Sequence, residues 1–437
     1  MSRRKPFLTA LLASSMLAGL IAAASAEDLV TTDRVGKADA PNVLTMRANP
    51  NQSPNNPIPD QKAAFAKVWQ AWAEKHPDWQ IKFEFFTTDI GGEHARLLEQ
   101  ARAGRAPDCV TVDSFQLGLF VKNKVLQPLD SYFTKDEVAD LFPFIRTGIT
   151  GPDGHIYAWW WGTDLRVLWR NKDIVATPPD TWATLKQAAL DAVKKGSPEG
   201  YIFNGGRWEG TTFDWLAHFW SQGGKLVDDS GKPIFNEGDN RGKMLTAMKF
   251  YKDLVDSGAS PKRVSTIKDY NDFNAAALAG TAAMFAGGHW QYFQLQSAMK
   301  PDQFAKWEAS ELPGPTADQR STGTGGWTVA AFSKDPKKID ACASVMREVY
   351  MGPANEVVGD LPTRQSLFDS LPKFKSDYYN QLRKYLVHGQ ARPGVPIYPE
   401  ISNQIQIMMG DVLSGSKAPE AALDGAWNAV QAAYKKM

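Results

Sequence analysis

The stretch with the most unusual side-chain chemistry is YAWWWGTDLRVLW, residues 157–169, where three consecutive tryptophans precede a glycine, a threonine and an aspartate. If the segment is extended, Trp159 and Trp161 share one face and Trp160 takes the other. A tryptophan ring can stack on the apolar C–H face of a sugar while a carboxylate such as Asp164 accepts bonds from the sugar hydroxyls. A dense aromatic core at a domain junction would use the same residues, so this stretch alone leaves both interpretations open.

Three other tryptophans lie beside Gly-Gly pairs, in the segments GGRW, GGHW and GGW. They are Trp208, Trp290 and Trp327. Glycine has no side chain, so backbone N–H groups of these segments can approach a ligand closely. The chain has 15 tryptophans, more than cores alone need, and some are therefore available for a binding surface.

The sequence lacks the spacings that catalytic and metal sites require. None of the six histidines pairs with another at i, i+3 or i, i+4, and the two cysteines are far apart. Serine-hydrolase, zinc-protease and P-loop motifs are all missing from the sequence. We therefore expect no metal, no cofactor and no enzymatic activity.

The N-terminal residues predict an exported protein. A basic segment ending at Lys5 precedes the apolar run FLTALLASSMLAGLIAAA, and Ala24-Ser25-Ala26 is a small-x-small cleavage site. We expect a signal peptide over residues 1–26, cleaved after Ala26, and a periplasmic location. The general secretory route is favoured, with twin-arginine export as the alternative.

The overall composition predicts a soluble globular chain of two domains. It has 437 residues, with 49 lysines and arginines against 48 acidic residues. Such a balanced charge argues against nucleic acid as a partner.

Short strands and amphipathic helices alternate along the first part of the chain. The predicted strands are 42–48, 79–86 and 107–113, separated by helices that include residues 94–103 and a stripe of Phe65, Trp69 and Trp72. This alternation is typical of an α/β fold with a mostly parallel sheet covered on both faces by helices. After residue 170 the pattern is more helical.

The two cysteines, Cys109 and Cys342, permit two interpretations in an exported chain. They could form a disulfide, or they could be two separate buried thiols, since each lies in an apolar pattern. The pattern favours buried thiols.

Several blocks of the sequence resemble one known family. They are IYAWWWGTDLRVLWRNKDI with PPDTWATL, ARAGRAPDCVTVD, VLQPLDSYF, AALAGTAAMFAGGHW, ELPGP with GTGGWTVAAFSKDP, and GDLPTRQS. In their order along the chain they resemble the periplasmic substrate-binding proteins of ABC sugar importers, the family that includes maltose-binding protein. Two departures stand out: tryptophan replaces the usual proline after the hinge tyrosine Tyr157, and WRNKD replaces the usual Y-Y-N-K-D.

The resemblance implies a two-lobed periplasmic-binding-protein fold that closes on a ligand held between the lobes. The N-terminal lobe would comprise 41–157 plus 330–390, and the C-terminal lobe 163–325 plus 391–437. Hinge segments would lie near 156–163, 324–332 and 388–395, which places the tryptophan run on the cleft wall. The implied partners are a small carbohydrate and an inner-membrane ABC permease, and the chain is expected to be a monomer.

The resemblance, together with strand ends and residue chemistry, indicates a set of ligand-binding residues. They are Asn49, Asp113, Ser114, Trp160, Trp161, Asp164, Trp208, Glu209, His289, Trp290, Gly326, Trp327, Arg364, Arg392 and Tyr398. The arginines decide the ligand's charge, because a phosphate or sulfonate would recruit a bidentate arginine and a neutral sugar would not. Arg364 and Arg392 are the best candidates for such a clamp.

Three alternatives to neutral-sugar import stay open. The first is import of an anionic derivative, such as a glycerol phosphate ester or a sulfonated sugar. The second is a secreted glycan-active hydrolase, whose paired carboxylates could lie in a tryptophan-rich cleft. The third is a binding protein that presents its ligand to a chemoreceptor.

Overall fold

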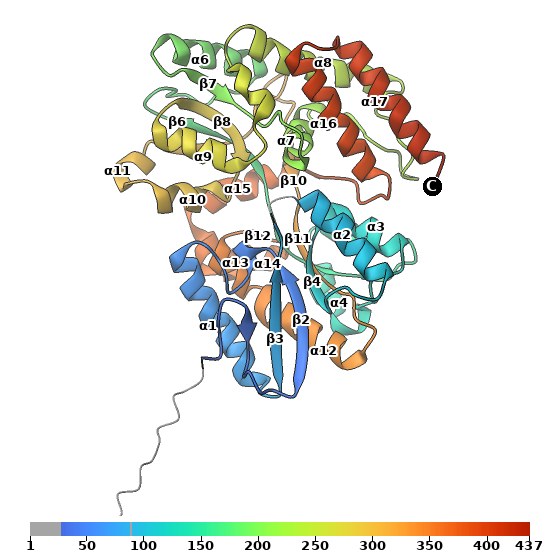
Figure 1. The fold of residues 1–437 in the computed structure, drawn as a ribbon. Helices are drawn as coiled ribbons and strands as arrows, with labels where there is room; N and C mark the ends of the chain where they lie inside the picture. Colours follow the sequence, from blue (N-terminus) through green and yellow to red (C-terminus); the bar gives the residue numbers. More distant parts are fainter. Residues whose placement is uncertain (1–27, 88–89) are drawn as a thin grey trace, which may run out of the picture.

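The computed structural model describes residues 28–87 and 90–437, which form two lobes, each around its own sheet (Figure 1). The predicted signal peptide lies outside the described residues. Within the described part of the chain, every helix is too short or too polar to cross a membrane.

The first lobe contains a seven-stranded sheet of mixed direction. In spatial order its strands are β1 (Arg34–Val35), β3 (Trp79–Phe85), β2 (Asn42–Ala48), β4 (Cys109–Asp113), β11 (Gly326–Ala331), β5 (Trp159–Thr163) and β12 (Leu361–Pro362). Strand β2 runs parallel to β3 and β4, whereas β11 and β12 pair antiparallel with their neighbours. The predicted parallel arrangement therefore holds only for β3, β2 and β4, since β1 also pairs antiparallel with β3.

The second lobe is more helical and its sheet is smaller. The strand order is β7 (Glu199–Ile202), β8 (Ala282–Gly288), β6 (Arg166–Asn171) and β9 (Trp307–Ser310). A separate parallel pair, β10 (Thr322–Thr324) and β13 (Gly389–Ala391), completes the strands.

The helices cover both sheets and the junction between them. Those of the first lobe are α1 (Pro59–Lys75), α2 (Ile90–Arg102), α3 (Leu117–Lys122), α4 (Lys135–Ala139), α5 (Pro143–Ile149), α12 (Pro336–Val345) and α13 (Pro353–Val358). Those of the second lobe are α6 (Trp182–Lys194), α7 (Glu209–Trp220), α8 (Asp239–Asp256), α9 (Tyr270–Ala279), α10 (Gln291–Ala298), α11 (Pro301–Phe304), α16 (Tyr398–Ser414) and α17 (Pro419–Tyr434). Helices α14 (Gln365–Ser370) and α15 (Asp377–Tyr385) lie near the junction (Figure 1).

Local sequence explains the limits and faces of these helices. The predicted stripe of α1 is confirmed, since Phe65, Trp69 and Trp72 are all buried. Helix α6 starts at a capping box in which the Thr181 side chain accepts from the backbone N–H of Thr184.

The cores place the last part of the first-lobe prediction differently. The core around the seven-stranded sheet extends along the chain to Val358. Side chains between residues 361 and 386, including Phe374 and Tyr379, belong instead to the core of the second lobe. Strand β12 (Leu361–Pro362) nevertheless belongs to the sheet of the first lobe, so the expected limits of the two lobes, with 330–390 in the first, stay a proposal. The chain passes between the lobes at 163–166, near 325 and near 389–391, and hinge motion at these points stays a proposal.

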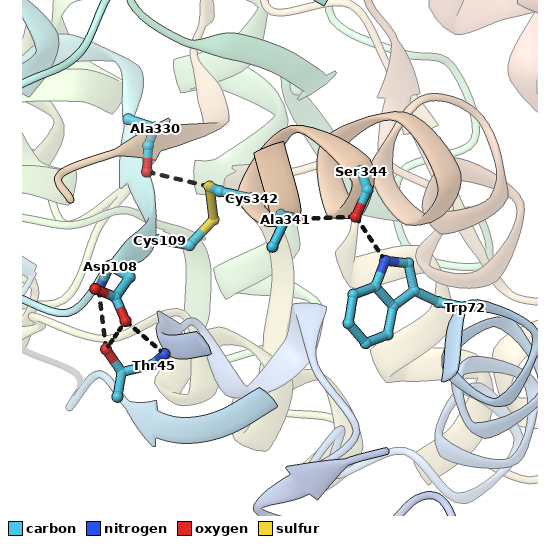
Figure 2. The surroundings of a disulfide bond; sticks show 8 residues. All are labelled: Thr45, Trp72, Asp108, Cys109, Ala330, Ala341, Cys342 and Ser344. Carbon is cyan, nitrogen blue, oxygen red and sulfur yellow. Dashed lines mark hydrogen bonds between the residues drawn. A yellow bond between two sulfur atoms is a disulfide. The ribbon is translucent and has the colours of Figure 1, made fainter. Parts of the chain in front are cut away.

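The two cysteines form a disulfide, which corrects the preference for separate thiols. Cys109 begins β4 and Cys342 lies in α12, with 5.6 Å between their Cα atoms and 233 residues between them in sequence (Figure 2). Nearby, the Trp72 indole N–H donates to the Ser344 hydroxyl at 3.0 Å. The sequence pattern missed the bond because it shows that each cysteine is buried, not that the strand and the helix meet there.

Candidate functional site

A cleft of about 560 Å³ lies between the two lobes. Both lobes and the connections between them contribute side chains to its wall. The residues used below are Asn49, Asp113, Asp164, Arg166, Trp208, Glu209, Phe213, Tyr270, Trp290, Gly326, Trp327, Asp360 and Arg392. We refer to this cavity as the cleft.

The ends of strands and the starts of helices bring these residues together. Asn49 directly follows β2, and Asp113 is the last residue of β4, at the same edge of the first sheet. From the second lobe, Glu209 is the first residue of α7, and Trp290 lies between β8 and α10. The arrangement explains how short, separate motifs form a single site.

Arg392 joins the two lobes across the cleft. Its Nη2 donates to Asp113 Oδ1 at 2.7 Å in the first lobe, and its Nη1 donates to Glu209 Oε1 at 3.0 Å in the second. The guanidinium also lies 3.9 Å from the centre of the Phe213 ring, a cation–π contact. The two carboxylates that bind this arginine belong to different lobes. This bridge therefore depends on the position of one lobe relative to the other.

Arg166 makes a second, similar group within the second lobe. Its Nε donates to Asp214 Oδ1 at 2.6 Å and its Nη1 to Asp164 Oδ1 at 3.2 Å. It lies 3.8 Å from the Phe213 ring centre and 4.7 Å from that of Trp290. Each arginine of the cleft is thus bound by two carboxylates, and neither presents an uncompensated positive charge to a ligand.

Burial also changes the acidity of two cleft carboxyl groups. Burial raises the pKa of Asp113 to about 6, and this exceeds the opposing attraction of Arg392. Burial, with the nearby charge of Asp164, raises the pKa of Asp360 to about 7. These two groups therefore bind protons more readily than exposed aspartates do.

Nine of the predicted residues line the cleft. They are Asn49, Asp113, Asp164, Trp208, Glu209, Trp290, Gly326, Trp327 and Arg392. The three tryptophans of this group are half-buried, so that part of each ring is open to a ligand. Gly326 has φ +129°, and an added Cβ would lie 2.1 Å from the Gly162 carbonyl oxygen, so only glycine fits there.

Four predicted residues do not line the cleft. Tyr398 is buried and donates to Glu209 Oε1 at 2.7 Å, so it holds a lining residue in place. His289 is buried with its Nε2 3.2 Å from the Gly359 carbonyl oxygen, and burial lowers its pKa to about 4, which keeps it neutral. Ser114 is buried beside Asp113. Arg364 donates to Asp140 Oδ2 at 2.9 Å, outside the cleft wall.

The tryptophan run is core, which corrects its expected place on the cleft wall. Trp159, Trp160 and Trp161 are 1, 2 and 1% exposed, and among the described residues that line the cleft none of the three occurs. The alternation of faces is real, but β5 lies inside the sheet and both faces are covered. The Trp160 ring contacts Phe144 on one side, and the Trp161 ring contacts Tyr350 on the other.

Sequence reasoning did not select several residues of the cleft wall, among them Arg166, Phe213, Tyr270 and Asp360. In the structure Arg166 forms an ion pair with Asp164. Phe213 follows Glu209 by four positions in α7, and this helical spacing was a usable signal. Asp360 and Tyr270 carried no local signal, because only the fold brings their segments to the cleft.

Comparisons with known proteins agree with this architecture. The family model of bacterial extracellular solute-binding proteins matches residues 55–344. A probable ABC transporter-binding protein of Deinococcus radiodurans is 26% identical over 324 residues, which are 68% of this chain and 73% of that protein.

Two solved structures have the same fold. Maltose-bound MalE3 of T. maritima has a TM-score of 0.77 at 22% identity, over 89% of this chain and 99% of that one. A solute-binding protein of an ABC transporter from Thermotoga lettingae, bound with α-D-tagatose, has a TM-score of 0.75 at 26% identity, over 89% and 98% of the two chains. The two-lobed fold expected from the sequence is therefore confirmed.

Proposed function

Because the chain belongs to the bacterial extracellular solute-binding proteins, we propose that it captures a carbohydrate or sugar derivative in the cleft and delivers it to the permease of an ABC importer. The solved relatives that bind maltose and tagatose support a sugar as the ligand. We further propose that the protein works as a monomer in the periplasm, is cleaved after Ala26, and does not turn its ligand over.

One observation carries this proposal: half-buried tryptophan rings from both lobes face a single cleft that also contains carboxylates. Trp327 belongs to the first lobe, whereas Trp208 and Trp290 belong to the second. Rings on both sides can hold the C–H faces of a sugar, and Asp113 and Asp164 can accept from its hydroxyl groups.

The mechanism that follows is closure. A ligand held by one lobe gains contacts with the other only when the lobes approach, so it favours the closed form by its differential affinity. Arg392 already contacts Asp113 and Glu209 from opposite lobes, and a bound sugar would add to that bridge.

The anionic alternative has no support in the cleft. Arg392 is held by two carboxylates, and Arg364 pairs with Asp140 elsewhere. A phosphate or sulfonate would have to displace these carboxylates while facing their negative charge.

A thermal-shift screen tests the function. The purified protein is heated with mono- to trisaccharides and with their phosphorylated and sulfonated counterparts. Ligand at 100 times its Kd stabilises by about 2.7 kcal/mol, enough for a shift of a few degrees. We expect stabilisation by a non-anionic sugar and no release of reducing ends from any oligosaccharide. Stabilisation by anions alone, or by no sugar, would contradict the proposal.

A further inference from the structure

The cleft wall has an excess of negative charge. Four carboxylates line it, Asp113, Asp164, Glu209 and Asp360, against two arginines. A fifth carboxylate, Asp214, is bound to Arg166 behind the wall. The two arginines are therefore already compensated, and the charge of Asp360 has no counterpart on the cleft wall.

Asp360 lies opposite Asp164. Strands β12 and β5 pair antiparallel, with Leu361 opposite Thr163. One step further along this register brings Asp360 opposite Asp164, and both side chains reach the cleft. Like charges directly opposite each other on neighbouring strands are unfavourable, so this pair needs either a proton or a cation.

The free oxygens of this pair are available to a ligand. Within residues 28–87 and 90–437, the Asp360 carboxylate makes no hydrogen bond or ion pair. Asp164 uses Oδ1 for the Gly325 N–H at 2.9 Å and for Arg166, and Oδ2 has no partner among the described residues. Burial, with the charge of Asp164, raises the pKa of Asp360, and this exceeds the opposing attraction of Lys373.

Lys373 is close enough to Asp360 to oppose the rise of its pKa, but among the described residues the two side chains form no ion pair. Lys373 donates through Nζ to the carbonyl oxygens of Glu356 and Val357, the latter at 2.9 Å. It also lies 4.6 Å from the Phe293 ring centre, and it does not belong to the cleft wall. A metal is also disfavoured, because the described residues contain no group of three or more histidines, cysteines or carboxylates suited to one.

We propose that the sugar captured by the cleft carries a protonated amine, bound between Asp360 and Asp164. This inference rests on the proposed function and narrows its ligand to amino sugars or oligosaccharides that contain one. An ammonium group donates up to three hydrogen bonds and supplies the missing positive charge, whereas a hydroxyl group supplies hydrogen bonds only. The tryptophan rings would still hold the apolar face of such a sugar, since an amine replaces a hydroxyl at the rim.

The test uses matched sets of ligands. Each set contains a parent sugar, its 2-amino-2-deoxy form and the N-acetylated form of that amine, for mono- and disaccharides of the gluco, galacto and manno series. Titration calorimetry at pH 6.5 and low salt gives the Kd of each. For the series that binds best, we expect the amine to bind at least about tenfold tighter than the parent and the N-acetylated form, as charge-assisted hydrogen bonds are stronger than neutral ones.

Substitutions test whether Asp360 is the residue that causes the preference for the amine. Asp360→Asn should remove the advantage of the amine, so that the amine and the parent sugar, both measured with this variant, have Kd values within about threefold of each other. Asp369→Asn is the matched control, because that carboxylate is exposed and pairs with Arg383 away from the cleft; it should keep the preference. If Asp360→Asn does not fold, the comparison of amine, parent and N-acetylated sugar in the unaltered protein still decides.

The outcomes separate this inference from the function on which it rests. Binding of a parent or N-acetylated sugar as tight as that of the amine would overturn the inference and keep the proposed function. A preference for the amine that persists in Asp360→Asn would also overturn it. Failure of every sugar to bind, charged or neutral, would overturn the proposed function itself.

Discussion

Two groups of tryptophans in this molecule differ in how far their rings are buried. The run Trp159 to Trp161 is almost completely buried in the first lobe, although it is the densest aromatic segment of the sequence. The isolated tryptophans beside Gly-Gly pairs, such as Trp290, line the cleft and are only half-buried. Local density of aromatic residues is therefore a poor guide to a binding surface. Position at a strand end, beside flexible glycines, is a better one.

The difference follows from the place of each segment in its sheet. Strand β5 has partners on both sides, β11 and β12, and both of its faces are covered. Trp290 follows the end of β8, where the chain leaves the sheet and faces the other lobe. Substitutions in the two groups should accordingly affect different quantities.

The largest expected effect is on the stability of the first lobe. Trp160→Ala removes a ring that contacts Phe144 and donates to the Gly162 carbonyl oxygen at 3.0 Å. We expect a loss of about 3–5 kcal/mol in the free energy of unfolding, as is typical for deletion of a buried aromatic ring. Denaturant titration measures this loss. Weaker sugar binding at unchanged stability would instead place the run in the site.

Removal of the disulfide should also affect stability and not the cleft. Cys109 begins β4, and the cleft residue Asp113 ends it, so the bond lies at the far end of that strand. The double variant Cys109→Ala with Cys342→Ala should lose about 2–4 kcal/mol of unfolding free energy with an unchanged Kd for sugar. Thermal melting and calorimetry measure the two quantities, and a changed Kd would show that the disulfide helps to shape the cleft.

Trp290→Ala should show the opposite pattern. This ring lies at the cleft wall, so its loss should weaken sugar binding by about 2 kcal/mol, roughly thirtyfold, as for a typical aromatic anchor. Stability should fall by less than it does for Trp160→Ala. Calorimetry measures the Kd. An unaltered value would remove Trp290 from the site and erase the distinction between the two groups.

The smallest effect concerns the pH dependence of stability at the cleft. The pKa of Asp360 is about 7 in the folded protein against about 3.9 when unfolded. The folded state therefore binds more protons between pH 4 and 7, and the free energy of unfolding falls as pH rises through this window. Asp360→Asn should be more stable than the unaltered protein at pH 8 and equal to it near pH 4.

Thermal melting of both proteins across this pH range checks the prediction. Asp369→Asn, at an exposed ion pair, should show no such pH-dependent gain. A melting difference for Asp360→Asn that is the same at pH 4 and pH 8 would contradict the assigned role of its charge.

Much of the fold was predictable because its signals are local. The spacing of Phe65, Trp69 and Trp72 indicates a helix, and the apolar run Cys109 to Asp113 indicates a buried strand. Both patterns can be recognised within a short stretch of sequence. The packing of the chain after residue 358 was less predictable. Segments in the last part of the chain can pack on either lobe, and their sequence patterns do not show on which lobe each one packs.

The site was predictable where a residue directly follows or ends a strand, as for Asn49 and Asp113, because the ends of parallel strands meet at one edge of the sheet. It was not predictable where a role depends on a partner. From the sequence, Arg392 is a candidate for binding an anion. In the structure, Asp113 and Glu209 already form ion pairs with it.

The sequence by itself determined the family, the two-lobed fold and part of the cleft wall, since these rest on local patterns and on the order of short blocks. Only the tertiary structure decided three features. They are the burial of the tryptophan run, the disulfide across 233 residues, and the opposition of Asp360 and Asp164. Each depends on contacts between segments distant in the chain, and it is such contacts that set whether a ring is covered, a thiol is paired or a charge is compensated.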